Sequence, residues 1–161
     1  MDPKSARKHA PIALHRGFGS HVVRLADMVL ARANAALQPL ELTPLGYGTM
    51  ACIADGDGLS QMELSRQLNM YAPKMVGLLD GLEKRGLVER KVSPADRRQH
   101  MLLLTPKGEA LLQRAAAVAA ALEEELFGSL PDEDKARFEA LVERLEETEG
   151  ERGAAAAELR A

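Results

Sequence analysis

Aromatic residues and cysteine are both scarce in this chain. Only 3% of the 161 residues are aromatic, and none is tryptophan. Because strands favour aromatic and β-branched side chains, a core of Leu, Val, Met and Ala favours packed helices over a β-sandwich. The lone cysteine, Cys52, excludes an internal disulfide framework and a cysteine-based zinc cluster. It is either a small buried hydrophobe or a redox-sensitive thiol beside a cation, and its apolar neighbours favour the hydrophobe.

Long hydrophobic runs are also missing. No apolar stretch approaches the roughly 20 residues that cross a bilayer, and the first residues, MDPKSARKHAP, lack the apolar segment of a secretion signal. We therefore expect a cytoplasmic protein without membrane contact. The sequence also lacks a glycine-rich phosphate loop, a nucleophile elbow and a metal-ligand pattern, so we expect neither enzymatic activity nor a cofactor.

The net charge of −3 hides an uneven distribution of charged residues. Residues 66–107 carry nine Lys or Arg against four Asp or Glu, whereas residues 108–161 carry six against fourteen. Local field, rather than total charge, decides where a phosphate backbone docks. Residues 66–107 are therefore the candidate segment for contact with a polyanion.

This basic segment contains a predicted β-hairpin. Residues 87–92 and 100–104 are rich in branched apolar side chains, and the SPAD sequence at residues 93–96 has turn chemistry. The tip carries three charged residues, Asp96, Arg97 and Arg98. Arginines at the end of a two-stranded ribbon can enter a narrow, electronegative DNA groove, and an Asp two residues earlier can orient the Arg98 guanidinium. The alternative is a solvated hairpin tip.

Two short helices are predicted immediately before the hairpin. Ser60 and Glu63 form a capping box that opens a helix ending near Leu68. After a tight turn, Pro73 occupies the first turn of a second helix, which ends at Gly86. One face of that helix is apolar at helical spacing: Met75, Leu78, Leu79 and Leu82. These elements make a helix-turn-helix, and the hairpin adds a wing.

Longer helices are predicted on both sides of this motif. The first covers about residues 12–37, with a possible break at the glycines of residues 17–19, and a second starts at Thr43-Pro44. A third runs from Thr105-Pro106 to about Phe127, and the last begins between residues 129 and 132 and fades after residue 150. A long helix with few neighbours in its own chain is most simply buried against a second copy, so we expect a two-fold homodimer.

Two glycines, Gly46 and Gly48, weaken the helix that starts at Thr43-Pro44. They allow either tight packing of that helix or a cavity beside it.

These elements divide the chain into four parts. Residues 1–11 form a disordered basic N-terminus, residues 12–42 plus 105–150 a helical dimerisation region, residues 43–104 a DNA-binding domain and residues 151–161 a disordered tail. The predicted fold class is mainly α, a winged helix-turn-helix with a two-stranded β-hairpin wing and an N- and C-terminal helical dimerisation region.

The order and spacing of three motifs resemble those of the MarR family of bacterial transcriptional regulators. The motifs are SQMELS from Ser60, LEKRGLVER from Leu82, and DRR at residues 96–98 followed by LTPKG at residues 104–108. The resemblance covers roughly residues 20–147. It implies a homodimeric, nucleoid-associated repressor whose two winged domains straddle a pseudo-palindromic operator.

The resemblance also implies which residues contact double-stranded DNA, with the second helix of the motif in the major groove and Arg98 in the minor groove. The expected DNA-binding residues are Gln61, Asn69, Tyr71, Ala72, Pro73, Lys74, Asp96, Arg97 and Arg98. Gln61 and Lys74 lie at helix starts, where backbone N–H groups face phosphates. The start of the second helix departs from the Ser-, Thr- and Arg-rich pattern common in the family, because Lys74 is the only cation in its first two turns.

A small phenolic or acidic effector, bound between the dimer helices and the DNA-binding lobe and releasing the DNA, is a further implication of the resemblance. The expected effector-binding residues are His15, Arg16, His21, Arg24 and Met50. The first four share a region of the first predicted helix where they could meet an anion. Their alternative role is a solvated or ion-paired helix face.

A function of another class stays open, because a fold does not fix a function. Winged helices and acidic dimerising helices also serve as non-enzymatic protein–protein adaptors. The unusual residues 71–73 and the acidic residues 108–161 favour this alternative. A basic face formed by the wings and the second helices of the motif would favour DNA.

Overall fold

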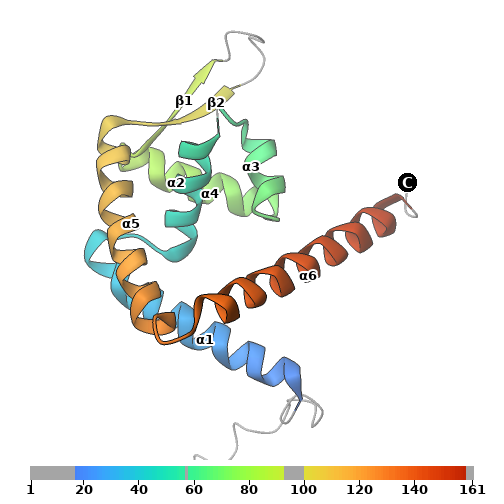
Figure 1. Cartoon of the computed structure of the whole chain (residues 1–161). Helices are drawn as coiled ribbons and strands as arrows, with labels where there is room; N and C mark the ends of the chain where they lie inside the picture. Colours follow the sequence, from blue (N-terminus) through green and yellow to red (C-terminus); the bar gives the residue numbers. More distant parts are fainter. Residues whose placement is uncertain (1–16, 57, 93–99, 159–161) are drawn as a thin grey trace, which may run out of the picture. The chain divides into compact units, whose positions relative to one another are not determined.

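The computed structural model describes residues 17–56, 58–92 and 100–158, with side chains up to Thr148 (Figure 1). The chain divides into two compact units, residues 1–122 and residues 123–161, and each is considered by itself. None of the helices in the described ranges is long and apolar enough to cross a membrane.

The first unit begins with helices that follow their sequence signals. Helix α1 spans Phe18–Leu37, a short 3-10 helix η3 spans Gln38–Leu40, and α2 spans Pro44–Asp55. The part of the first predicted helix before residue 17 lies outside the described residues. Thr43 caps α2, since the Gly46 N–H donates to its Oγ1 at 3.0 Å. This confirms the predicted helix start at Thr43-Pro44.

The winged helix-turn-helix follows in the predicted order. Its helices are α3 (Gln61–Gln67) and α4 (Ala72–Lys84), and its strands are β1 (Val88–Val92) and β2 (His100–Leu104). The strands pair antiparallel, with Val88 opposite Leu104 and Val92 opposite His100. In Figure 1 they stand above α2, α3 and α4. Gly86, at φ +69°, ends the turn between α4 and β1 in a conformation that glycine adopts without strain.

Two long helices complete the chain. Helix α5 spans Pro106–Phe127, as the sequence predicts, and α6 spans Asp132–Glu158. The continuation of α6 past Gly150 corrects the expected disordered tail, whose first residues, 151–158, are helical. Each helical glycine costs about 1 kcal/mol relative to alanine, but the Ala- and Glu-rich sequence around Gly150 and Gly153 favours helix strongly enough to offset that cost.

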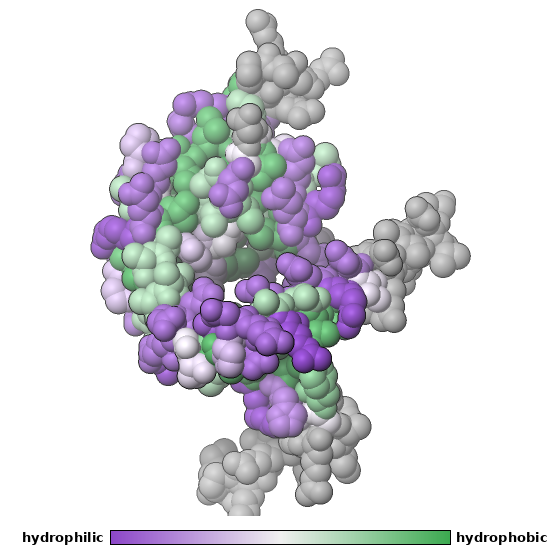
Figure 2. Space-filling model, in the orientation of Figure 1, coloured by the Kyte–Doolittle hydropathy of each residue, from purple (hydrophilic) through white to green (hydrophobic). Residues whose placement is uncertain are grey.

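The core of the first unit lies between the helix-turn-helix, α2 and the hairpin. Its large side chains that are almost fully buried include Met50, Leu64, Met75, Leu79, Leu87 and Leu102. Cys52 is partly buried and packs against this core. Hydrophobic residues also reach the surface of the winged part between hydrophilic ones (Figure 2).

The two glycines of α2 have different surroundings. Gly46 is buried, and an added Cβ would lie 3.3 Å from the Thr43 Oγ1. An added Cβ at Gly48 would have no heavy atom within 4 Å. Tight packing therefore explains Gly46, whereas Gly48 borders open space.

Hydrogen bonds from basic side chains fasten the end of α4 to its neighbours. Arg85 donates from Nη1 to the Glu41 carbonyl oxygen at 2.6 Å, and Lys107 donates from Nζ to the Arg85 carbonyl oxygen at 2.7 Å. The hydroxyl of Thr105 donates to the Gly86 carbonyl oxygen at 2.7 Å. These bonds satisfy carbonyl groups that a helix end leaves without partners, and they fix the root of the wing relative to α4.

Candidate nucleic-acid interface

The start of α3 is held by the predicted capping box. The Ser60 N–H and hydroxyl donate to Glu63 Oε2 at 2.8 and 2.7 Å, and the Glu63 N–H lies 3.3 Å from the Ser60 hydroxyl oxygen. These bonds, from the Ser60 side chain first and its backbone second, lower the pKa of Glu63. The capping box therefore orders the chain at Gln61, the first residue of α3.

A tight turn joins α3 to α4. Asn69 is exposed and has φ +44°, a left-handed conformation that Asn tolerates better than most residues. The Met70 N–H donates to the Ser65 carbonyl oxygen at 2.8 Å, which closes the turn. The left-handed backbone of this turn by itself accounts for an Asn at position 69, without any role in DNA binding. The exposed Asn69 side chain could also contact a ligand at the surface.

The first turn of α4 is exposed. Tyr71 occupies the N-cap position without a side-chain capping bond and is 77% exposed, and Ala72, Pro73 and Lys74 are also exposed. The opposite face of the helix is buried through Met75, Leu79 and Leu82. The core thus anchors one side of α4 and turns the four predicted DNA-binding residues of its first turn to the surface.

Arg90 of β1 ties the wing to α4. Its guanidinium donates to Asp80 Oδ1 at 2.8 Å and to Glu83 Oε2, and both carboxylates belong to α4. The Arg90 side chain is about one-quarter exposed, at 25%. The pairing fixes the angle between strand and helix and compensates two negative charges on α4.

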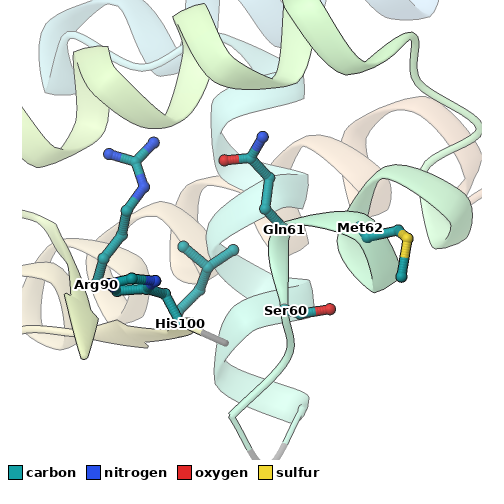
Figure 3. A pocket seen from close by; sticks show the side chains of 6 residues that line it. Ser60, Gln61, Met62, Arg90 and His100 are labelled. Atoms are coloured by element: carbon teal, nitrogen blue, oxygen red, sulfur yellow. The ribbon is translucent and has the colours of Figure 1, made fainter. Parts of the chain in front are cut away.

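A hollow of about 410 Å³ lies between the start of α3 and the base of the wing. Its lining consists of Ser60, Gln61, Met62, Arg90, His100 and Leu102. Figure 3 shows Gln61 and Arg90 extending on opposite sides of this hollow, whereas Met62 points away from it. Gln61 and the wing base are thus brought to one surface, although they are distant in the sequence.

The wing tip itself, with Asp96, Arg97 and Arg98, lies outside the described residues. The described strands end at Val92 and resume at His100, and these two residues are partners in the hairpin. The tip therefore connects the free ends of two paired strands.

Comparison with known proteins shows which family shares this arrangement. A family model described as MarR family matches residues 40–99, which contain α2, α3, α4 and β1. The transcriptional regulator HosA of Escherichia coli O111:H- is 33% identical over 105 residues, which cover 65% of this chain and 78% of HosA. The chain belongs to the MarR family.

Solved structures of regulators share most of this fold. CouR from Rhodococcus jostii RHA1 bound to p-coumaroyl-CoA is 29% identical, with a TM-score of 0.77 over 84% of this chain and 95% of CouR. The repressor CouR bound to a 23-mer DNA duplex is 31% identical, with a TM-score of 0.73 over 88% of this chain and 98% of CouR. This protein is therefore a MarR-family DNA-binding transcriptional regulator, and its named relatives are regulators rather than enzymes.

Three of the five expected effector-binding residues lie within the described part of the chain. His15 and Arg16 lie outside the described residues. His21 and Arg24 are exposed on α1, where an Arg24 guanidinium nitrogen lies 3.1 Å from His21 Nδ1. Met50 is fully buried in the core. Their part in effector binding stays a prediction.

Arg90 is a positioning residue that sequence reasoning missed. Its carboxylate partners lie seven and ten positions earlier in the chain, on a different element. No short-range spacing rule connects a strand residue to such partners, because the pairing depends on how β1 returns along α4. The available signal was a basic residue within residues 87–92, which the sequence predicts as a strand.

Proposed function

We propose that this MarR-family regulator is a homodimeric repressor that binds a pseudo-palindromic operator and releases it when a small-molecule effector binds. The observation that carries the proposal is the exposed start of α4, presented by a capped helix-turn-helix and braced to the wing through Arg90. CouR, a repressor of the same fold, is solved bound to a DNA duplex.

In the proposed complex, α4 enters the major groove and the wing enters the minor groove. Lys74 and Gln61 contact phosphates near the starts of α4 and α3, where helix N–H groups add to the attraction. Asn69, Tyr71, Ala72 and Pro73 complete the surface against the major groove. At the wing tip, Arg98 enters the minor groove, Asp96 orients it and Arg97 contacts a phosphate.

The homodimer is supported by large hydrophobic side chains that are exposed in the described part of the chain. On α1, large hydrophobic side chains are exposed at Phe18, Val22, Val23, Met28 and Leu30. On α6, considered by itself, the exposed hydrophobic residues are Phe138, Leu141 and Leu145. Exposed large apolar side chains on a helix favour an interaction site, and a second copy would bury them. We therefore assign residues 12–42 and 105–150 to dimerisation.

The effector proposal rests on α2 and on a relative. The Thr49 hydroxyl is fully buried and has no hydrogen-bond partner within the described part of the chain. Its neighbour Gly48 borders open space. Since a buried hydroxyl without a partner is costly, a ligand that bonds to Thr49 would gain that energy. CouR binds p-coumaroyl-CoA, which supports an acidic or phenolic effector for this chain also.

Selection of genomic fragments tests the operator. The purified full chain would be mixed with sheared DNA from its source at near-physiological salt, and the retained fragments would be sequenced. The same selection would be made with the Arg98→Ala variant. Arg137→Ala, on α6, is the matched control. We expect one inverted repeat with half-sites about 34–36 Å apart, lost with Arg98→Ala and kept with Arg137→Ala. Affinity should fall steeply with salt, because phosphate contacts release counterions.

Other outcomes of this selection point elsewhere. Retention of random fragments would show binding without base readout. Retention of none, together with copurification of a protein, would support the adaptor function instead.

Effector binding is tested separately by thermal unfolding and operator release. A ligand that binds only the folded state raises Tm, so p-coumaric acid and p-coumaroyl-CoA would each be titrated against the free protein and the operator complex. We expect the ligand to raise Tm and to release the DNA. Both effects should be smaller in the Thr49→Val variant. A rise that Thr49→Val leaves unchanged would move the effector away from α2.

A further inference from the structure

The exposed side of α4 offers few polar side chains for reading base edges. From Tyr71 to Gly77 the exposed residues are Tyr71, Ala72, Pro73, Lys74, Val76 and Gly77. Lys74 is the only one with a charged side chain, and none is Arg, Asn, Gln, Asp or Glu. Those missing residues are the ones that make paired hydrogen bonds to guanine or adenine or accept from cytosine. Within residues 71–77, side-chain hydrogen bonding to bases is therefore limited to Lys74 and the Tyr71 hydroxyl.

The next polar residue along α4 is already occupied. Asp80 accepts a hydrogen bond from Arg90 at 2.8 Å, and Glu83 one turn later accepts from the same guanidinium. A carboxylate held in this way is less available to accept from a cytosine amino group. The third turn of α4 therefore does not supply the base contacts that the first two lack.

Most of the exposed residues from Tyr71 to Gly77 are instead apolar. Tyr71 is 77% exposed and Val76 is 40% exposed, so both hydrophobic side chains reach the surface. At 3.6 residues per turn, Pro73 lies on the face opposite the buried Met75 and Leu79, and Val76 lies nearly one turn later at the flank of that exposed face. The only apolar group on the major-groove edge of DNA is the C5-methyl group of thymine.

We propose that α4 recognises its half-site mainly through thymine methyl groups packed against Val76, Pro73 and the Tyr71 ring, with Lys74 contacting a guanine or a phosphate. This inference rests on the proposed function, which places α4 in the major groove. It makes Val76 a specificity-determining residue and assigns A·T pairs to the centre of each half-site.

Gly77 has a complementary role at this surface. Beyond the backbone of its own helix and its chain neighbours, a Cβ at Gly77 would meet no heavy atom of the described residues within 4 Å, so the described packing does not require glycine there. A glycine in a helix nevertheless destabilises it relative to alanine. Because Gly77 has no side chain, α4 can approach the base pairs closely enough for the neighbouring Pro73 and Val76 to contact thymine methyl groups.

Removal of single methyl groups from the operator tests the proposal directly. Each thymine under α4 would be replaced in turn by deoxyuridine, which keeps the base pair and lacks only the methyl group. We expect affinity to fall roughly fourfold for each contacted methyl group, the fold-change that burial of one such group corresponds to. The same replacement in the flanking duplex should leave affinity unchanged.

A double-mutant cycle connects the methyl group to the side chain. Val76→Ala removes two methyl groups from an exposed position of a helix, so the variant should fold. In that variant, the deoxyuridine replacement at the thymine contacted by Val76 should cost less than twofold. At the same position, a C·G pair should bind weakly, and 5-methylcytosine should restore part of the affinity.

The glycine is tested with a matched pair on the same helix. Gly77→Ala should raise Tm and weaken operator binding, because a methyl group would stand between helix and base pairs. Gly81→Ala makes the same change one turn later, also in open space, and should raise Tm while keeping operator affinity within about twofold, the size of an effect without a buried methyl contact.

The outcomes separate this inference from the proposed function. If an operator is selected but every deoxyuridine replacement is neutral, or if the methyl effect persists unchanged in Val76→Ala, the methyl-reading assignment is wrong while the repressor proposal stands. If no operator is selected, the proposed function itself fails.

Discussion

One added methyl group at Gly108 tests the packing that places the wing. Gly108 is buried in the first turn of α5. A Cβ there would fall against the carbonyl oxygen of Leu87, with the Leu87 carbonyl carbon at 3.0 Å and Cα at 3.3 Å. All three are backbone atoms. The same carbonyl oxygen accepts from the Thr105 N–H at 3.1 Å, so it cannot move away without breaking the joint between hairpin and helix.

The expected cost of Gly108→Ala follows from this geometry. At an open helical site the change stabilises by about 1 kcal/mol. Here α5 must shift away from Leu87, which costs roughly 1–3 kcal/mol as overpacking, and the Thr105 bond weakens, which costs about 1 kcal/mol more. We expect the free energy of unfolding to fall by about 1–3 kcal/mol in total.

Urea unfolding followed by circular dichroism measures this cost, with all variants at one protein concentration because a dimer's stability depends on it. Gly81→Ala is the matched control. The same chemical change in open space should raise the free energy of unfolding by up to about 1 kcal/mol. A Gly108→Ala variant as stable as the unchanged protein would refute the packing account of the wing root.

Three further perturbations address single contacts. Thr49→Val removes a buried hydroxyl without a partner in the described structure, so the free energy of unfolding should rise by about 1 kcal/mol in the urea assay; a fall would mean that the hydroxyl is satisfied. Arg90→Gln removes both ion pairs to α4. We expect the free energy of unfolding to fall by about 1 kcal/mol, since the pairs are partly solvated. Operator affinity, measured by fluorescence anisotropy, should also fall, and this loss of affinity should shrink as salt screens the two freed carboxylates. Hydrogen bonds from Ser60 lower the pKa of Glu63. The capping box therefore contributes fully to the stability of the folded state at pH values above the ordinary Glu pKa of 4.5, and this contribution is lost as the pH falls through the lowered pKa. Ser60→Ala should return the Glu63 carboxyl titration, followed by NMR, toward the ordinary value, and an unchanged titration would contradict the assigned cause.

Element boundaries were predictable where a local signal existed. Thr43 with Pro44, and Ser60 with Glu63, mark helix starts through hydrogen bonds that span three residues. The strand pairing of residues 88–92 with 100–104 agrees with two branched runs around a turn. The end of α6 was harder, because Gly150 is a weak stop within residues that favour helix.

The side chains of the candidate site were only partly predictable. The exposure of Tyr71 and Lys74 follows from the apolar spacing on the opposite face of α4. The burial of Met50 did not follow, since an apolar residue on α2 fits either a core or a pocket wall until the neighbouring elements are placed.

The sequence by itself determined the helices, the hairpin, the order of the winged helix-turn-helix and the family, because caps, turns and periodic apolar faces act between residues a few positions apart. Only the tertiary structure decided that Arg90 holds Asp80 and Glu83, that Gly108 packs on Leu87 and that Gly77 has no neighbour. These relations join different elements, and their energies depend on distances that arise when the elements pack around one core.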